Sequence, residues 1–437
     1  MSFTAVGDAL IERHLPQGGY SGFKQIKDIL NKGDTRFFNL ETTLHNFESF
    51  ASEYSGGGWL CSPPSVLNDL KAFGFNITAW ANNHTMDYSY GGLKKTLQNV
   101  HQAGIPLAGA GKNLQEASQP AYFDSKSGRV AVVAGTSTFN SPQLNEPAAI
   151  AGNASIYLKG RPGLNPLRHK DVYYVTKEDA KKLKQIANYT HIDDDAQFYR
   201  DTGFAPQNTK GVITFGSQIT FKESSIPGHK SFADHRDLLR FKKNIEEARA
   251  EADYVIVSIH CHEMKTKDRE SIPDFLKEFA HKCINFGADA IVGHGPHTLR
   301  AIEIYQHKPI FYSLGDFIVH IENFKKGPAD WFENYGLPTN STMHDLWKTV
   351  WANYTRGVQV NPKLFETVIP HWQTKDGKLT KLTLTPVELG FKYKISDGRR
   401  GWPTKASDSK ILDRLAKLSK PFNTQFKIKN NQAEIKL

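Results

Sequence analysis

The stretch IVGHGPHTLRA, residues 291–301, places two histidines three positions apart on a turn rich in glycine and proline. The apolar run ADAIV leads into it and predicts a buried strand, so His294 and His297 would lie at the mouth of that strand. A single loop histidine commonly only caps or hydrogen-bonds the backbone. Two at one strand end favour a metal or catalytic site, because imidazole is a common metal ligand and an acid or base near neutral pH.

Polar residues of the same kind end other predicted strands. They are Asp8 in TAVGD, Glu41 in FFNLE, Asn82, Asn83 and His84 in TAWANNH, and His260, His262 and Glu263 in IVSIHCHE. Ligands of open α/β sheets bind outside the carboxyl ends of the strands, so these side chains are expected to converge. Imidazole with carboxylate suits Zn, Mn or Fe, and carboxylate and amide oxygens suit harder ions such as Ca. The lack of a nearby CxxC pair argues against a structural cysteine–zinc site.

Each residue has a simpler explanation when it is taken alone. Asp8 could cap a turn, Glu41 could pair with a surface lysine, and asparagines are common in turns. Side chains alternate along a strand, so His260 and His262 would share one face, and periodicity does not decide which is a ligand. Seven other histidines lack such neighbours and are interpreted as surface or packing residues: His14, His45, His101, His169, His281, His307 and His320.

The elements that must position these residues alternate between strands and helices. FTAVGDALI, RFFNLETTL and NITAWANNH predict strands, and the apolar spacing in PPSVLNDLKAFGF predicts a helix that Gly74 ends. This β-α-β alternation predicts an α/β fold in which helices cover the sheet. The pattern degrades over about 157–235, which predicts an insertion of the kind that often forms a lid or binding loop. Regularity returns afterwards and runs through the strand DAIVGH to KPIFYSLGDFIVH, and an aromatic and basic C-terminal extension follows residue 321.

Composition excludes several classes of protein. The chain has 437 residues, 39% of them hydrophobic and 23% charged, which is typical of one large globular domain with additions or of two domains. The net charge of +10 is spread along the chain without a nucleic-acid-binding module, so it favours an anionic small substrate over nucleic acid. No apolar run reaches the roughly 18 residues of a membrane span. Without a signal peptide, and with three widely spaced cysteines, the sequence predicts a cytoplasmic protein, unless an anchor has been removed.

Seven motifs, in order over about residues 3–320, closely resemble the CapA family, named for poly-γ-glutamate capsule synthesis. They are VGDALI, NLETTL, WANNHTMDYSYGGL, AGAGKNLQEA, GRPGLNPLRH, SIHCHE and VGHGPHTLRAIEIYQHKPIFYSLGDF. That family is similar to calcineurin-like metallophosphoesterases. The resemblance implies a metallophosphoesterase-like, four-layer α/β/β/α sandwich over 1–320 with a two-metal site at the sheet edge. The insertion at about 157–235 belongs to this domain, and the extension at 321–437 would pack on the core.

The resemblance also implies roles for individual residues. The implied metal ligands are Asp8, Glu41, Asn83, His260, His294 and His297, and His84 is the implied proton donor. Metallophosphoesterases usually carry Asp-x-His first, whereas position 10 is leucine here. Glu41 replaces the bridging aspartate, and the final histidine pair is one residue wider. The site then either has one ligand fewer or gains His262, which is otherwise a second catalytic histidine.

The expected function is that of a metal-dependent hydrolase. Two divalent ions (Mn, Zn, Fe or Ca) about 3.5–4 Å apart can activate water and polarise a carbonyl or phosphoryl oxygen. This suits an amide or phosphoester bond of a peptide, a glutamyl polymer, or another capsule or cell-envelope substrate. In one alternative the chain is a peptide epimerase, in which histidines remove and return the Cα proton. Some CapA-like proteins without a membrane anchor resemble enzymes of this kind. In the other it is a non-catalytic scaffold of polymer synthesis. The sequence specifies no oligomeric state.

Overall fold

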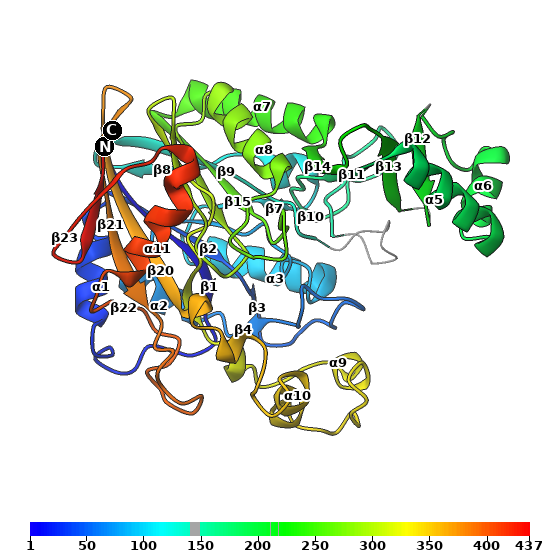
Figure 1. The fold of residues 1–437 in the computed structure, drawn as a ribbon. Coiled ribbons are helices and arrows are strands. Elements are labelled where there is room, and N and C mark those ends of the chain that lie inside the picture. Colours follow the sequence, from blue (N-terminus) through cyan, green and yellow to red (C-terminus); the bar gives the residue numbers. More distant parts are fainter. Residues whose placement is uncertain (140–148, 210, 217) are drawn as a thin grey trace.

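Apolar residues on both faces of many strands require sheets that are covered on both sides. The computed structural model describes residues 1–139, 149–209, 211–216 and 218–437, and there two large sheets pack face to face (Figure 1). The first follows the order β23 (Phe426–Lys429), β24 (Gln432–Ile435), β21 (Lys378–Glu388), β20 (Glu366–Lys375), β1 (Ser2–Leu10), β2 (Thr35–Leu40), β5 (Ile77–Ala79), β6 (Leu107–Ala108), with β19 (Asp316–Val319) beside β1 and β22 (Thr404–Lys405) beside β21. The second follows the order β17 (Ile302–Tyr305), β18 (Lys308–Phe311), β16 (Ala290–His294), β15 (Tyr254–His260), β9 (Gly128–Thr136), β8 (Ala121–Ser125).

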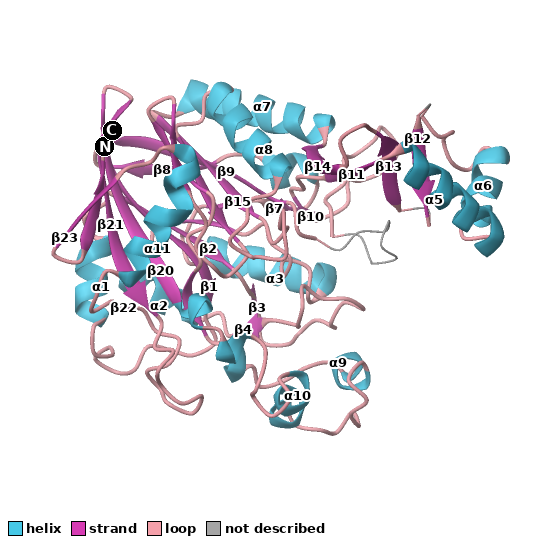
Figure 2. Cartoon of the chain, viewed as in Figure 1, coloured by secondary structure: helices cyan, strands magenta, loops and turns pink. Residues whose placement is uncertain are grey.

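Three apolar cores separate the layers. The core between the sheets includes Phe37 of β2 and Ile256 of β15, and α11 (Lys410–Ser419) also packs into it. The outer face of the first sheet is covered by α1 (Phe23–Leu30), α2 (Val66–Phe73) and α3 (Ser89–Gln102). The outer face of the second sheet is covered by α7 (His235–Glu251) and α8 (Asp274–Asn285) (Figure 2). The predicted four-layer α/β/β/α sandwich is thereby confirmed.

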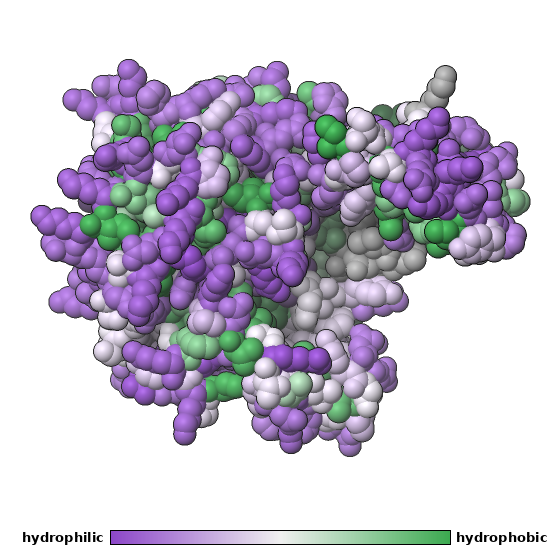
Figure 3. Space-filling model, viewed as in Figure 1, coloured by the Kyte–Doolittle hydropathy of each residue, from purple (hydrophilic) through white to green (hydrophobic). Residues whose placement is uncertain are grey.

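Residues after about 157 add a small lobe to this core. Its sheet has the order β12 (Val212–Phe215), β13 (Ile219–Glu223), β11 (His169–Val175), β14 (Gly228–Ala233), and α5 (Lys177–Thr190) and α6 (Asp194–Asp201) belong to it. The lobe projects from the sandwich, and the face seen in Figure 3 is mostly hydrophilic there and over the main body. Leu164 and Leu167, which precede the first strand of the lobe, are fully buried in the sandwich. Residues 210 and 217 of the predicted insertion lie outside the described residues.

The C-terminal residues contribute strands to the first sheet and a separate helical segment. β20 pairs antiparallel with the first residues of β1, and β19 pairs parallel with its last residues. The helices α9 (Ala329–Glu333) and α10 (Met343–Val350) form an aromatic cluster with residues 59–61. The remaining short elements are β3 (Thr43–Leu44), β4 (Cys61–Ser62), β7 (Ala110–Gly111), β10 (Gly163–Leu164) and α4 (Leu114–Ser118). In the described part of the chain, no helix combines the length and the apolar character that crossing a membrane requires.

Three strand predictions differ from the structure in detail. NITAWANNH forms a strand only over Ile77–Ala79, because the asparagines and His84 lie in the turn that follows. KPIFYSLGDFIVH contains β18 and β19, which belong to different sheets, because the chain crosses between them at Ser313–Gly315. Asp8 lies two residues before the end of β1, at a bulge in the pairing with β19.

Candidate metal centre

The register of two parallel strands brings His260 and His294 together. β15 and β16 pair with these two histidines directly opposite each other. Ile256 of β15 and Val292 of β16 face the core between the sheets, and side chains alternate along a strand, so both histidines continue that inward row. Ser258 lies on the same row, and its hydroxyl is 2.8 Å from Nε2 of His294. Both rings therefore lie at the end of the inter-sheet core, facing the first sheet.

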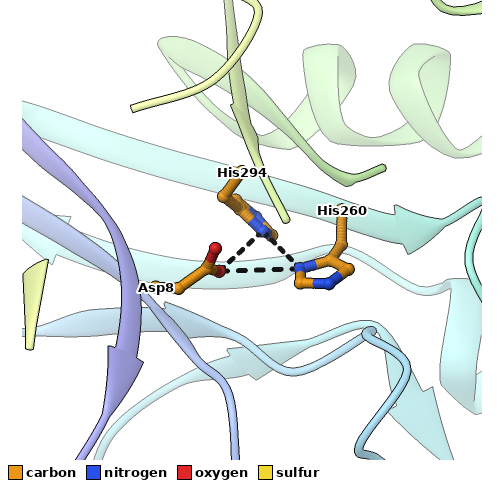
Figure 4. Close-up of side chains that lie close together, drawn as sticks. All are labelled: Asp8, His260 and His294. Atoms are coloured by element: carbon orange, nitrogen blue, oxygen red, sulfur yellow. Dashed lines mark hydrogen bonds and ion pairs between the residues drawn. The ribbon is translucent and has the colours of Figure 1, made fainter. Parts of the chain in front are cut away.

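Asp8 meets these histidines from the opposite sheet (Figure 4). Its Oδ1 lies 3.2 Å from Nδ1 of His294 and 3.5 Å from Nδ1 of His260. The carboxylate is held in place because Asn39 donates to Oδ1 at 2.7 Å and the Gly295 amide donates to Oδ2 at 2.8 Å. Gly295 has φ +114° and lies against the backbone of Cys261, so a side chain at this position would not fit.

These three side chains form a first group suited to a metal ion. Nδ1 of His260 and Nδ1 of His294 lie 2.9 Å apart, and one ligand atom from each, with one from Asp8, falls within 4.8 Å of the others. Burial lowers the pKa of His260 to about 4, although Asp8 raises it. His260 is thus neutral at physiological pH, which is the form that binds metal. A cation between these atoms would satisfy both facing nitrogens and the carboxylate.

Glu41 joins this group to a second one, which contains His262 and His297. It directly follows β2, and its Oε1 lies 3.6 Å from Nε2 of His260 and 3.9 Å from Nε2 of His262. Its Oε2 lies 3.8 Å from Nδ1 of His297. Both oxygens are buried, and neither has a hydrogen-bond partner among the described residues. Buried carboxylate oxygens are rarely left unpaired, so Glu41 is a suitable ligand for a cation.

The second group contains one residue that the sequence did not single out. Asp316 lies 2.8 Å from Nδ1 of His297 and is in register with Asp8 across β1 and β19. Burial would lower the pKa of His297, but the charge and hydrogen bond of Asp316 raise it. His297 adopts a left-handed backbone with φ +57°, which is costly for a residue with a side chain and is often found at functional sites. The signal in the sequence was a second Gly-Asp pair, in SLGDF, which repeats that of AVGDA.

The glycines of both Gly-Asp pairs bring the two aspartates together. A Cβ on Gly7 would lie 1.8 Å from the carbonyl oxygen of Gly315, and this carbonyl accepts a 3.0 Å hydrogen bond from the Asp8 amide. Only glycine permits this approach of the two backbones. The close contact places Asp8 and Asp316 side by side in the centre.

Charge in the centre is unbalanced without a cation. Asp8, Glu41 and Asp316 are all buried. The pKa of Glu41 is well above its usual range because of burial and of the charges on Asp8, Asp316 and Asp87. Burial also raises the pKa of Asp316, whereas the two histidines hold that of Asp8 well below its usual range. Divalent ions would neutralise these carboxylates, so the residues present fit a metal centre.

Glu41→Gln should therefore change stability in opposite directions with and without metal. Because its pKa is raised in the folded state, the contribution of Glu41 to the stability of the metal-free fold is fully present below its unfolded pKa of about 4.3. This contribution is lost as the pH rises through the folded pKa. At pH 7.5 the neutral amide should raise the melting temperature of the chelated protein. Metal affinity should fall by more than the roughly 10–100-fold that loss of a ligand's hydrogen-bond partner costs. Melting curves with chelator and with Mn²⁺ measure both effects.

The matched control for this variant is Glu333→Gln, an exposed residue of α9 outside the centre. It should alter neither melting curve. A Glu41→Gln protein that is less stable with chelator, and as responsive to Mn²⁺ as the parent, would contradict the assignment of Glu41.

Asn83 and His84 approach the centre from the turn after β5. The side-chain amide of Asn83 donates to the Gly56 carbonyl at 2.7 Å, and its buried Oδ1 has no hydrogen-bond partner in the described part of the chain. His84 points Nδ1 at Asp87, 2.7 Å away. Asp87 also accepts hydrogen bonds from the amides of Leu60 and Gly56, so it is fixed in place. Asp87 was not foreseen from the sequence, where only its spacing of three from His84 signals the pair.

The remaining strand-end residues have structural roles, and the centre opens on one side. Asn82 caps the turn through Thr85 and the Leu40 carbonyl, and Glu263 accepts from Ser137 and Thr138. The side chain of His262 is 27% exposed, whereas those of His260 and His294 are fully buried. Solvent therefore reaches the centre at His262.

Comparison with known proteins places this geometry in context. The family model described as bacterial capsule synthesis protein PGA_cap matches residues 2–320. An uncharacterized protein, y4sH of Sinorhizobium fredii, is 31% identical over 100% of this chain and 93% of its own length. The PGA biosynthesis protein CapA of Bacillus subtilis is 24% identical over 93% of this chain and 83% of its own. The capsule biosynthesis protein CapA of Bacillus anthracis is 24% identical over 73% of this chain and 59% of its own length.

Proposed function

The chain belongs to the PGA_cap family of bacterial capsule synthesis proteins, and on that premise we propose that it is a metal-dependent hydrolase. Its substrate would carry an amide or phosphoester bond in a glutamyl peptide, a capsule polymer or another anionic cell-envelope component. One observation carries the proposal: within the described ranges, both oxygens of the buried Glu41 lack hydrogen-bond partners, and they lie between two groups of potential ligands. The names of the Bacillus relatives support the glutamyl context.

The ligands divide into two sets around Glu41. Asp8, His260 and His294 would hold one ion. His262 and His297 would hold the other, together with Asp316, which lies 2.8 Å from His297. In this arrangement His262 serves as a ligand, which compensates for the leucine at position 10. Asn83 Oδ1 is available to complete a coordination sphere. When bound, two such ions would supply Lewis acidity toward a carbonyl or phosphoryl oxygen and would lower the pKa of water.

His84 would move the proton during hydrolysis. A neutral imidazole carries one N–H, and donation of Nδ1–H to Asp87 fixes the tautomer in which Nε2 is free to accept a proton. The ring is nearly buried, so its orientation is maintained by packing as well as by Asp87. In hydrolysis Nε2 would first take a proton from the attacking water and then deliver it to the leaving nitrogen or oxygen.

A second chemistry is favoured by one specific observation. Burial and the charges of His260 and His297 lower the pKa of His262, and the charge of His84 adds to this effect, so the two imidazoles lie near each other. Two imidazoles near one bound peptide could remove and return a Cα proton, which is epimerisation without cleavage. This alternative requires His262 to be free of metal, whereas hydrolysis is compatible with His262 as a ligand.

A metal analysis combined with a substrate panel tests the proposal. The purified protein is expected to retain about two divalent ions and to cleave at least one of an aryl phosphate, a phosphodiester and a γ-glutamyl peptide. An L-peptide incubated in D₂O distinguishes the alternative, because deuterium uptake at Cα without cleavage indicates epimerisation. Bound metal with neither reaction would contradict both and favour a scaffold of polymer synthesis.

A further inference from the structure

A basic cavity lies on the helical side of the second sheet, away from the residues of the metal centre. It has a volume of about 770 Å³ and is lined by α4, α7 and residues 150–168, within the usual range for ligand pockets. Its lining contains five cationic side chains, namely Arg161, Arg168, Arg236, Arg240 and Lys243, and one acidic side chain, Glu247.

Two sequence motifs that contribute nothing to the metal centre meet at this cavity. AGAGKNLQEA supplies Leu114 and Gln115, and GRPGLNPLRH supplies Arg161 and Arg168. The two motifs pair through β7 and β10. The cavity thus explains why these otherwise unassigned segments carry polar and cationic residues next to each other.

Part of the basic wall is fixed in place by a buried acid. Asp237 of α7 is fully buried, and it accepts hydrogen bonds from Arg168 at 2.6 and 2.9 Å and from Arg240 at 2.6 Å. Arg240 also donates to the side chain of Asn165 and to the carbonyl of Pro166. Guanidinium groups that are ordered before binding lose less entropy when a ligand arrives.

Two of the other cations, Lys243 and Arg161, are available to a ligand. Among the described residues, Lys243 has no hydrogen bond or ion pair. The one hydrogen bond from the Arg161 guanidinium there is from Nε to the Ile150 carbonyl, at 2.9 Å. Even with Asp234, which pairs with Arg236, and with Asp237 and Glu247 included, the described residues of the site have an excess of two positive charges. A cavity of this size and charge suits a ligand with several anionic groups rather than a single small anion.

The cavity wall is also connected to the metal centre through the backbone. The amide of Thr136 donates to the Asn165 carbonyl at 3.1 Å, and the Thr136 hydroxyl donates to the carbonyl of His260 at 3.1 Å. Thr136 therefore links residues 165–168, of which Arg168 lines the cavity, to the end of β15 that carries His260.

We propose that this cavity binds two or more carboxylates of a glutamyl chain and serves as a second anchoring site for a polymeric substrate. The proposal deepens the proposed function and rests on it for the identity of the chain. Free guanidinium and ammonium groups form charge-assisted hydrogen bonds to carboxylates, with Arg in bidentate geometry. A polyphosphate offers the same charge, so the test includes both chemistries.

The test measures binding of fluorescently labelled γ-linked hexaglutamate to the full-length chain in chelator, where no turnover occurs. Arg161→Gln with Lys243→Gln should weaken binding about tenfold or more, because two charge-assisted contacts are lost. The control, Lys429→Gln with Lys436→Gln, removes the same charge from exposed residues of the distant β23–β24 edge and should leave binding unchanged. Tripolyphosphate serves as the competitor of equal charge type.

Three results would overturn the proposal: no binding of hexaglutamate to the parent protein, equal weakening in both double variants, or binding of tripolyphosphate alone. Circular dichroism verifies that the variants fold. Because binding is measured without metal, a failed hydrolase assay leaves this result interpretable. Equally, normal hydrolysis of a short γ-glutamyl peptide by the Arg161/Lys243 variant would be compatible with the proposal, since that substrate need not reach the cavity.

Discussion

Alanine at both His294 and His297 is expected to remove bound metal and abolish turnover while the chain stays folded. The double change takes one nitrogen ligand from each group around Glu41, so neither group keeps its full set. Ser258 also loses its contact with His294, and Asp8 loses a neighbour that lowers its pKa. The cost to the fold should be moderate, because the main apolar cores are untouched. Elemental analysis, turnover and circular dichroism of one preparation measure all three outcomes.

The matched control replaces two histidines outside the centre, His101 of α3 and His344 of α10, both of which are exposed. It should retain the metal and activity of the parent. Full metal content in the His294/His297 variant would refute the assignment of this turn as a metal-binding element. Loss of both metal and secondary structure would instead show that the turn is needed for folding.

The convergence of the site could be predicted because it depends on local rules. Parallel neighbours end at the same edge of a sheet, and side chains alternate, so His260 and His294 follow from strand position alone. The β-α-β alternation likewise predicted the helices that cover each sheet. Glu41 and the Asn83–His84 turn follow strands that run in the same direction as β1 and therefore reach the same edge.

The parts that could not be predicted depend on contacts between distant segments. Asp316 reaches the centre because β19 crosses to the first sheet and pairs with β1, 308 positions away in sequence at Asp8. No periodicity distinguishes β18 from β19 within the apolar run that contains both. Asp87 joins the site only because the turn after β5 folds back on itself, which a spacing of three residues does not reveal. Long-range register of this kind is set by packing, and local propensity carries little information about it.

His84→Ala should lower turnover by roughly 10²–10⁴-fold, the usual contribution of a positioned general acid or base. The Asp87 carboxylate orients the ring through Nδ1, so the other nitrogen is the one that exchanges a proton with substrate. His84 is not among the residues that group as ligands around Asp8 and Glu41, so metal content should stay at the parental level. Substrate affinity should also change little, which places the loss in kcat rather than in KM.

A suitable control for this variant is His45→Ala, which removes another buried imidazole of the same region without disturbing the metal centre. His45 contacts Cys61 and packs edge-on against Tyr88, so its loss costs packing but no proton transfer. If both variants lose turnover equally, the effect of His84→Ala is a packing effect. If His84→Ala loses metal and keeps the parental rate per bound ion, His84 is a ligand. A fall in kcat with metal retained, together with the loss of one limb of the pH–rate profile, assigns His84 to proton transfer.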